Sequence, residues 1–215
     1  MMHSASILHA TTDGDQLVAY MARVSNPANQ DKEKCSKSLI NYLIKHKHWS
    51  PFEMVNMCVE INTTRSIAAQ LLRHRSFSFQ EFSQRYSDVH SLGNPVIPAL
   101  RRQDTSNRQN SIDDIDHHDQ QIWLKMIQEH QNKGMALYTQ MLESGIAKEC
   151  AREVLPLATP SRLYMNGNLR SWIHYCQLRC SSDTQYEHRV IAKQIKMLIK
   201  QEFPLIYEAS ASYMA

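Results

Sequence analysis

Glycine is scarce in this sequence. The chain has five glycines among its 215 residues, whereas the usual share of ~7% would give about fifteen. They stand at Gly14, Gly93, Gly134, Gly145 and Gly167, and the closest two are eleven positions apart. This spacing excludes the G-x-G-x-x-G dinucleotide fingerprint and the G-x-x-x-x-G-K-[ST] phosphate loop, whose glycines recur within about six residues so that backbone can approach phosphate. If the protein binds a nucleotide, side chains must hold it.

Long apolar runs are absent as well. No stretch approaches the ~18 consecutive apolar residues of a membrane span, and the start of the chain, residues 1–4, lacks the basic-then-apolar layout of a signal peptide. We therefore expect a cytoplasmic protein without membrane contacts. A hydrophobic share of 42% with 21% charged residues is typical of a folded chain rather than a disordered one. The length predicts a single domain over residues 1–215.

The cysteines form no C-x-x-C pair and are odd in number. They are Cys35, Cys58, Cys150, Cys176 and Cys180. Without a secretory signal we interpret them as reduced, mostly buried thiols. The spacing H-x-C-x₃-C of His174, Cys176 and Cys180 raises the alternative of a zinc site, but on a helix these side chains diverge, so the sequence predicts no metal site.

The net charge is modest, and the type of basic residue is more informative than the size of the net charge. A formal net charge of +3 is too mild to indicate nucleic-acid binding by itself. Arginine supplies more than half of the 24 basic residues. Guanidinium groups suit carboxylate and phosphate partners, because their donors form a planar fork.

Hydrophobic periodicity predicts an α+β fold. Helices are expected over 15–23, 36–47, 65 to about 74, 122–144, 148–157 and 169–179, and extended segments over 55–61 and 161–166. Asn168 is the expected N-cap of the helix over 169–179, and Thr184 to Glu187 resemble a capping box opening a last helix to about Phe203. Residues 88–120 lack periodicity, and a loop of that length is usually functional or poorly ordered.

The end of the helix over 65–74 concentrates polar groups. At ~100° per residue, Gln70, Arg73 and His74 share one face, opposite the apolar stripe. Taken alone, this arrangement is typical of a solvated basic helix end that complements the macrodipole. The following residues, 76–87, contain few aliphatics. If extended, they place four polar residues on one edge: Glu81, Ser83, Arg85 and Ser87. Such an edge can bind a phosphate, a sugar hydroxyl and a base, although a sheet edge with a surface salt bridge is the simpler alternative.

The order Arg73-His74-Arg75, seven residues, then Ser83 resembles the R-H-R-x₇-S signature of the flavin-dependent thymidylate synthases. Further blocks are similar to that family in the same order: Ala22 to Ser25, His48 to Glu53, Glu149 to Arg152, Leu155-Pro156, Asn168, Arg170, and Leu178-Arg179. The resemblance runs from Ser25 to Glu187, about three quarters of the chain.

This resemblance implies an α+β domain with helices packed around a mixed or antiparallel sheet. It also implies a methyltransferase that converts dUMP to dTMP with methylenetetrahydrofolate as carbon donor, FAD as hydride carrier and NADPH as reductant, in a homotetramer whose active sites lie where subunits meet. The implied flavin contacts are Ser25, Ser50, Arg73, His74, Arg75, Glu81, Asn168, Leu169, Arg170 and His174. The implied dUMP contacts are Gln70, Leu71, Leu72, Arg73, Glu81, Phe82, Ser83, Gln84, Arg85, Arg152 and Arg179. Arg179 would be the catalytic residue, lying against the uracil ring and stabilising its N3 anion, a role that suits a permanently charged guanidinium.

Several residues keep open alternatives. Ser83 invites a nucleophile hypothesis, but its hydroxyl needs a base and Glu81 is a weak candidate, so we expect it to bind phosphate. His48 and Tyr86 are candidates for stacking on the folate and flavin rings, although His48 is nearly as well explained as a surface histidine. Glu53 either ends a capping box or contacts the flavin. His174 stands where the family often has an amide; it shares a helix face with Arg170 and Gln177, and its protonation would make flavin affinity pH-dependent.

A rival from another class is a nucleic-acid-binding module that uses Arg101, Arg102 and Arg108 with the R-H-R turn as phosphate contacts. The acidic cluster from Asp113 to Asp119 and the low net charge argue against it. The 88–120 segment would instead form a lid over the substrate.

Overall fold

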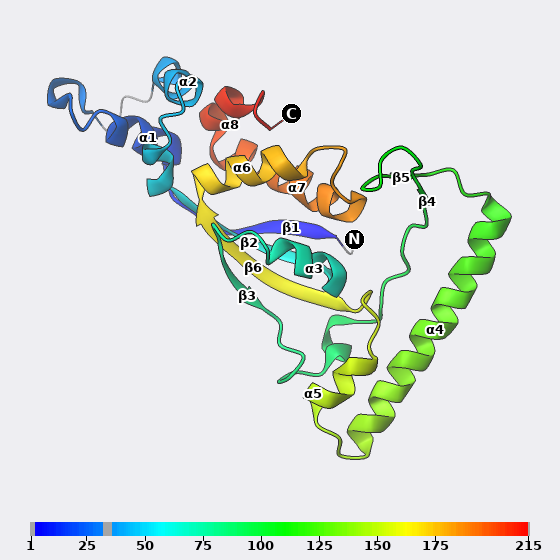
Figure 1. Ribbon diagram of the computed structural model, residues 1–215. Helices are drawn as coiled ribbons and strands as arrows, with labels where there is room; N and C mark the ends of the chain where they lie inside the picture. Colours follow the sequence, from blue (N-terminus) through cyan, green and yellow to red (C-terminus); the bar gives the residue numbers. More distant parts are fainter. Residues whose placement is uncertain (1–2, 32–35, 215) are drawn as a thin grey trace. The chain divides into compact units, whose positions relative to one another are not determined.

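The computed structural model describes residues 3–31 and 36–214, so the expectation for Cys35 lies outside the described residues. The fold is α+β, as predicted (Figure 1). A four-stranded sheet has the order β1-β2-β6-β3, and its strands are β1 (Ser4–Ala10), β2 (Asn56–Thr64), β6 (Pro160–Asn168) and β3 (Ser78–Glu81). A small antiparallel ribbon pairs β4 (Arg102–Gln103) with β5 (Ser111–Ile112).

Eight α-helices and four 3₁₀ turns accompany the strands within the described residues. The α-helices are α1 (Gly14–Ala22), α2 (Lys37–Lys45), α3 (Arg65–Leu71), α4 (His117–Glu143), α5 (Lys148–Ala151), α6 (Leu169–Arg179), α7 (Tyr186–Glu202) and α8 (Pro204–Ser210). The 3₁₀ turns are η1 (Pro27–Asn29), η2 (Ser50–Met54), η3 (Val89–Leu92) and η4 (Arg152–Val154). None of these helices is long and apolar enough to cross a membrane.

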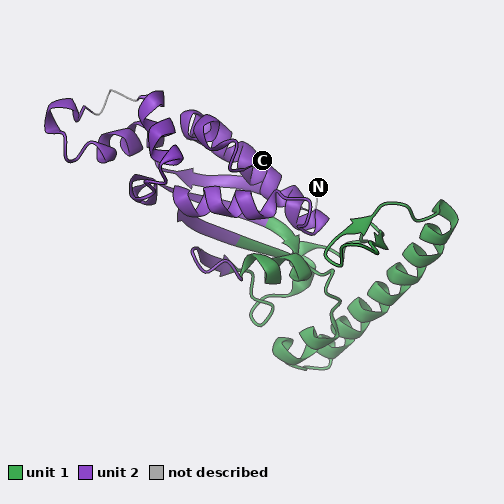
Figure 2. Cartoon of the chain, turned by 45° about the horizontal axis from the view of Figure 1, so that its top comes forward, with its two compact units in different colours: residues 1–2, 62–72, 81–163 green, residues 3–61, 73–80, 164–215 purple. Residues whose placement is uncertain are grey.

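The described chain divides into two compact units (Figure 2). Unit 1 comprises residues 62–72 and 81–163, and unit 2 comprises 3–31, 36–61, 73–80 and 164–214. The segments of the two units alternate along the chain. The single domain expected over 1–215 therefore stays a prediction.

Unit 2 has its core between α6, α7 and the alternating residues of β2. Met57, Val59 and Ile61 are fully buried at every second position of β2, as the period of a strand requires. Trp172 of α6 is also buried and donates its indole N–H to the carbonyl of Met57 at 3.0 Å. This bond fixes the position of α6, which carries several candidate site residues.

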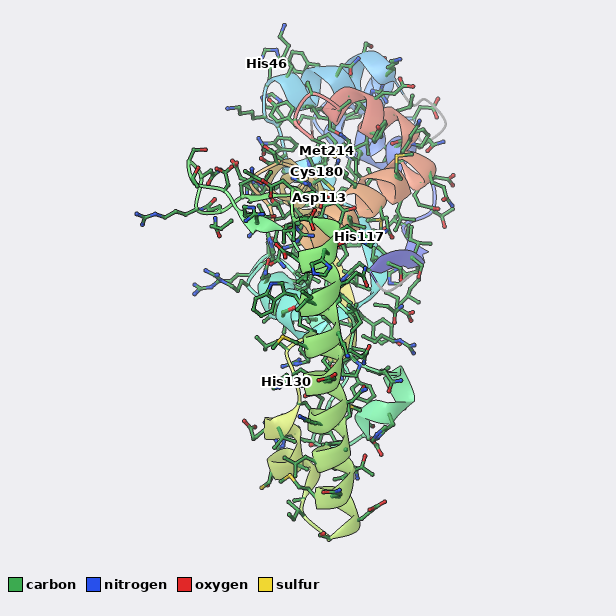
Figure 3. All side chains as sticks on the ribbon, turned by 90° about the vertical axis from the view of Figure 1, so that its right-hand side faces the viewer. His46, Asp113, His117, His130, Cys180 and Met214 are labelled. Carbon is green, nitrogen blue, oxygen red and sulfur yellow. The ribbon has the colours of Figure 1, made fainter. Side chains whose placement is uncertain are left out.

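Unit 1 contains a second apolar cluster, formed by Val89, Met135, Tyr138 and Ala151. Met135 and Tyr138 belong to α4, on which Figure 3 labels His117 in the first turn and His130 further along. The predicted start of this helix at residue 122 is wrong. It begins at His117, because the Asp116 carboxylate accepts the N–H of His118 at 2.8 Å and caps the helix.

Other local predictions are also wrong. The helix α3 ends at Leu71 rather than near His74. Residues 76–87 are extended only from Ser78 to Glu81, because the N–H groups of Tyr86 and Ser87 both bond to the Ser83 carbonyl and form a turn. The Thr184 hydroxyl donates to the carbonyl of Leu178 instead of capping α7.

The predictions for α6 and for the cysteines have mixed outcomes. Asn168 caps α6 as expected, since its Oδ1 accepts the N–H of Ser171 at 2.9 Å. Of the described cysteines, Cys176 is buried, Cys58 and Cys180 are half-buried, and Cys150 is exposed, so burial is not their common property.

Candidate functional site

A cavity of about 670 Å³ lies within unit 2. Its lining combines polar groups with two large aromatic side chains: Lys47, Trp49, Glu53, Ser76, Asn168, Arg170, Ser171, Ile173, His174, Gln177 and Tyr213. Arg170, His174 and Gln177 come from one face of α6, as the helical spacing predicted. The cavity is therefore a continuous surface built from α6, η2 and the ends of neighbouring segments.

The charges in this cavity are partly neutralised. The guanidinium of Arg170 is paired with the carboxylate of Glu53 in η2. Glu53 therefore contacts a candidate flavin residue rather than closing a capping box. The volume lies within the ~300–1,000 Å³ typical of ligand and cofactor sites, and the mixture of aromatic walls with fixed hydrogen-bonding groups fits a flat, polar-edged ring system such as a flavin.

The start of α6 fixes two of the predicted flavin residues. The Asn168 side chain is held by its cap bond to Ser171 and also lines the cavity. Leu169 is fully buried, and its N–H donates to the Val55 carbonyl at 2.9 Å. Leu169 therefore packs in the core, while Asn168 presents a polar edge to the cavity.

Arg179, the expected catalytic residue, is joined to the R-H-R motif inside unit 2. Its Nε donates to Nε2 of His74 at 3.0 Å. Burial, followed by the positive charge of Arg179, lowers the pKa of His74 to about 4. His74 is thus neutral near pH 7 with Nε2 unprotonated, which is the form that can accept this bond.

A layer of rings lies behind His74. The His74 ring meets Tyr175 edge-on at a centroid distance of 5.0 Å. The Tyr175 hydroxyl is 3.1 Å from Nε2 of His188, and both side chains are buried. Burial and then the charge of Arg179 lower the pKa of His188 to about 3. The packing of these neutral rings restrains His74 and, through it, Arg179.

The remaining flavin-side candidates of unit 2 lie at the surface. Arg73, Arg75, Ser25, Ser50 and His48 are all exposed. The His48 ring lies 5.7 Å from that of Tyr42, a centroid distance within the range of aromatic pairs. Their predicted roles stay predictions.

Unit 1 holds a smaller cavity, of about 350 Å³, and it brings together two residues of the predicted dUMP set, Gln84 and Arg152. The other lining residues are Arg65, Glu153, Leu155, Pro156 and Leu157. The Nε2 of Gln84 is buried and has no hydrogen-bond partner among the described residues. A buried donor without a partner is costly, and here it is available to a ligand acceptor.

Glu81 is already engaged within unit 1. Its Oε1 accepts from the Arg65 guanidinium and from the Ser161 hydroxyl. Arg85 pairs with Glu149 at 3.3 Å, and its guanidinium lies 6.0 Å from the ring of Tyr86, which is 78% exposed.

The rest of the predicted dUMP set includes core residues. Leu71 is fully buried, and Phe82 packs against the Val89 cluster. Gln70 and Ser83 are half-buried, while Leu72 is exposed. The side chains of Leu71 and Phe82 therefore support this part of unit 1 from within.

Comparison with known proteins agrees with this composition of the site. A family model described as thymidylate synthase complementing protein matches residues 6–205. A probable flavin-dependent thymidylate synthase of Paramecium bursaria Chlorella virus 1 is 48% identical over 203 residues, covering 94% of this chain and 93% of the relative. The flavin-dependent thymidylate synthase of Synechocystis is 50% identical over 194 residues, covering 90% and 87%. The chain belongs to the flavin-dependent thymidylate synthase family.

A solved structure extends the likeness to three dimensions. The UMP/dUMP methylase PolB of Streptomyces cacaoi, bound with 5-Br UMP, superimposes with a TM-score of 0.84 at 28% identity, covering 98% of this chain and 94% of that one. The same methylase bound with 5-Br dUMP gives a TM-score of 0.84 at 29% identity. The α+β fold and the family membership predicted from the sequence are thus confirmed.

Sequence reasoning missed several lining residues of this family member. In unit 2 they are Lys47, Trp49, Ser76 and Tyr213, and in unit 1 the main one is Arg65. Arg65 had a local signal, because a cation in the first turn of a helix opposes the macrodipole and needs an anionic partner. Tyr213 had none, since only the fold brings the end of the chain near Trp49, with ring centroids 6.0 Å apart.

The two rival interpretations gain no support from the geometry. No group of His, Cys, Asp or Glu within the described residues is arranged to hold a metal ion. Arg101 donates to the Ser111 hydroxyl and Arg102 to the Asp114 carboxylate. These arginines of the 88–120 segment are therefore engaged in local contacts of the β4–β5 ribbon.

Proposed function

We propose that the protein is a thymidylate synthase that transfers a one-carbon unit from methylenetetrahydrofolate to C5 of dUMP, with FAD as hydride carrier and NADPH as reductant. The hydrogen bond between Arg179 and His74 supports this most directly. It joins the residue expected at the pyrimidine to the R-H-R motif expected at the flavin. The high identity to the flavin-dependent thymidylate synthase of Synechocystis and to the probable one of the Chlorella virus agrees with it.

The cavity of unit 2 is the proposed flavin site. Asn168, Arg170 and His174 offer hydrogen-bonding groups from consecutive turns of α6, and Trp49 and Tyr213 offer aromatic surfaces. When bound, FAD supplies hydride chemistry that no amino-acid side chain provides. Ser25, Ser50, Arg73 and Arg75 are proposed to complete its contacts.

The dUMP phosphate and sugar are proposed to bind the segment Glu81 to Arg85 together with Arg152. Gln84 and Arg152 share a cavity, and Gln84 has a donor available for an acceptor. The Arg179 guanidinium is proposed to face the uracil ring. His74 occupies only Nε of Arg179, and no described residue bonds to the terminal N–H groups of this guanidinium. These groups are therefore left to stabilise negative charge on N3 and O4.

No enzyme nucleophile is proposed. Ser83 would need a base within hydrogen-bond reach, and Glu81 is the nearest carboxylate in the motif. The Glu81 Oε1 is occupied by Arg65 and Ser161, so it is poorly placed to take a proton from Ser83. Arg179 instead lowers the energy of charge on the pyrimidine, so that C5 can attack the carbon donor directly.

A homotetramer with shared active sites is part of the proposal. His48 and Tyr86, both exposed, would then meet the folate or flavin ring of a site completed by another subunit.

The 88–120 segment is proposed as the lid over the bound nucleotide.

The deciding experiment is tritium release from [5-³H]dUMP by the purified chain, with FAD and NADPH supplied or omitted. Release that requires both is expected, because loss of the C5 hydrogen accompanies methylation. Protein that is tetrameric and flavin-loaded but releases no tritium would overturn the proposal. Colourless protein that binds oligonucleotides with a steep salt dependence would favour the nucleic-acid module.

A second substrate, UMP, is favoured by one observation. The PolB methylase that shares this fold is described as acting on UMP and dUMP. The same assay with [5-³H]UMP distinguishes the two substrates. We expect dUMP to give the higher kcat/KM; equal values would show that the site does not discriminate at the 2′ position.

A further inference from the structure

Lys47 has an unusual backbone conformation at the edge of the unit 2 cavity. Its φ is 57°, in the left-handed region that residues with a side chain seldom adopt. Within the described residues the other non-glycine residue with positive φ is Asp13. Lys47 also lines the cavity, together with Glu53, Arg170 and His174.

The local cause of this conformation is the way α2 ends. The Lys47 N–H bonds to the Ile44 carbonyl at 3.1 Å, and the His48 N–H bonds to the Leu43 carbonyl at 2.8 Å. These two bonds are those of a Schellman motif, in which the residue after the C-cap is left-handed and is usually glycine. Lys47 occupies that position.

The same chain ends α4 with the same motif and uses glycine there. Gly145 has φ of 79°, its N–H bonds to the Leu142 carbonyl, and the Ile146 N–H bonds to the Met141 carbonyl. Gly145 lines none of the cavities described above, whereas Lys47 lines the largest one. Glycine would satisfy the backbone at position 47 without strain, so the lysine side chain needs another explanation.

The charges of the cavity suggest what that side chain binds. Arg170 and Glu53 neutralise each other as an ion pair. The Lys47 ammonium has no hydrogen bond or ion pair with any described residue. It therefore adds a positive charge to a cavity whose lining carboxylate, Glu53, is already paired. Lysine is a common point-charge partner of phosphate.

We infer that Lys47 binds a phosphate group of the dinucleotide that occupies the unit 2 cavity. This inference rests on the proposed function for the presence of a dinucleotide there. Both FAD and NADPH carry a pyrophosphate, and the experiment below separates these sources. The strain at Lys47 is then the local cost of placing an ammonium where a glycine would otherwise stand.

The test compares three substitutions. Lys47→Met removes the charge and keeps the strain, Lys47→Gly removes both, and Lys47→Arg keeps the charge. Lys45→Met is the matched control, since Lys45 is an exposed lysine in the last turn of the same helix and does not line the cavity. The readouts are the dissociation constants of FAD and of riboflavin, which has no phosphate, from the flavin-depleted full-length chain, together with KM for NADPH and thermal unfolding.

We expect Lys47→Met and Lys47→Gly to weaken FAD binding by about tenfold, as for one hydrogen bond to a charged group, with riboflavin unaffected. Lys47→Arg and Lys45→Met should bind FAD like the wild type. Lys47→Gly should nevertheless raise the unfolding midpoint by about 2–4 °C, because it relieves the left-handed strain. If Lys47 were retained only because it stabilises the fold, Lys47→Gly would lower the unfolding midpoint.

The test separates FAD from NADPH as the source of the phosphate, and failure of this inference from failure of the proposed function. A rise in KM for NADPH with unchanged FAD affinity would identify NADPH as the dinucleotide whose phosphate Lys47 binds. If Lys47→Met leaves both the FAD dissociation constant and KM for NADPH unchanged, or if Lys45→Met changes them equally, the inference is overturned while the proposed function stays intact. Wild-type protein that binds neither FAD nor riboflavin would overturn the proposed function itself.

Discussion

At the scale of single residues, His74 and His188 are neutral groups packed near a permanent positive charge. Burial and Arg179 lower the pKa of both rings. A protonated His74 would have no lone pair for the Arg179 N–H and would repel the guanidinium. The orientation of the proposed catalytic arginine therefore depends on imidazoles that stay uncharged at neutral pH.

This dependence predicts a loss of stability in mild acid. His188 titrates near its ordinary pKa of 6.5 in the unfolded chain and at about 3 in the folded one. Below pH 6.5 the unfolded state thus binds a proton at His188 that the folded state does not. This one proton lowers the stability by about 1.4 kcal/mol for each pH unit of acidification. His188→Gln, which keeps a hydrogen-bonding group near Tyr175, should lower this slope in urea unfolding between pH 7 and pH 5.

The control is His118→Gln, at an exposed position in α4. This variant should keep the pH dependence of unfolding free energy that the wild type shows. An identical slope in wild type and His188→Gln would show that His188 is protonated in the folded protein, contrary to its burial.

Ser83 provides a second test at this scale. If it binds the nucleotide phosphate rather than attacking the ring, Ser83→Ala should raise KM for dUMP by about tenfold, the loss of one hydrogen bond to a charged group, and leave kcat measurable. Steady-state tritium release at varied dUMP separates the two parameters. Complete loss of turnover with unchanged dUMP affinity would instead identify a nucleophile.

At the scale of elements, α6 sets the geometry of the proposed flavin site. Its first turn is fixed by the Asn168 cap, its middle by the bond of Trp172 to Met57, and its end carries Arg179. Asn168 has two functions in this view, since it caps the helix and faces the cavity.

The two functions of Asn168 can be separated. Asn168→Ala removes the cap and should cost about 1 kcal/mol, lowering the unfolding midpoint by about 2–4 °C, and it should also weaken FAD binding. Asn168→Asp keeps the cap and should unfold like the wild type, yet bind FAD less tightly, because a carboxylate cannot donate a hydrogen bond. Thermal unfolding and flavin titration are the measurements. Normal FAD affinity in both variants would exclude a flavin contact.

How much of the fold and of the candidate site could be predicted depended on how far apart in the sequence the interacting residues lie. The Asn168 cap and the shared face of Arg170, His174 and Gln177 follow from residues close in sequence, and both were predicted. The pairing of Arg170 with Glu53 spans 117 residues, and no local pattern indicates it. The extended segment ends at Glu81 because Ser83 accepts the turn bonds of Tyr86 and Ser87, a preference that alternation of residue types does not reveal.

At the scale of the whole chain, the scarcity of glycine agrees with a site made from side chains. Six of the proposed ligand groups are arginines, whose side chains are long. Four of them divide between the units: Arg85 and Arg152 belong to unit 1, and Arg170 and Arg179 to unit 2. Long side chains can act across a subunit boundary, which a tight glycine loop does less easily. The proposed tetramer makes this division testable.

If each active site combines residues of different subunits, two inactive variants should complement each other. Arg152→Ala and Arg179→Ala should each lose most activity alone. After mixing under conditions that exchange subunits, some sites would receive an intact Arg152 from one chain and an intact Arg179 from another, so tritium release should partly recover. The control mixes the Arg152→Ala/Arg179→Ala double variant with either single variant, which leaves one arginine missing from every site and should stay inactive. Native mass spectrometry would verify exchange; mixed tetramers without recovery would mean that both arginines of a site come from one subunit.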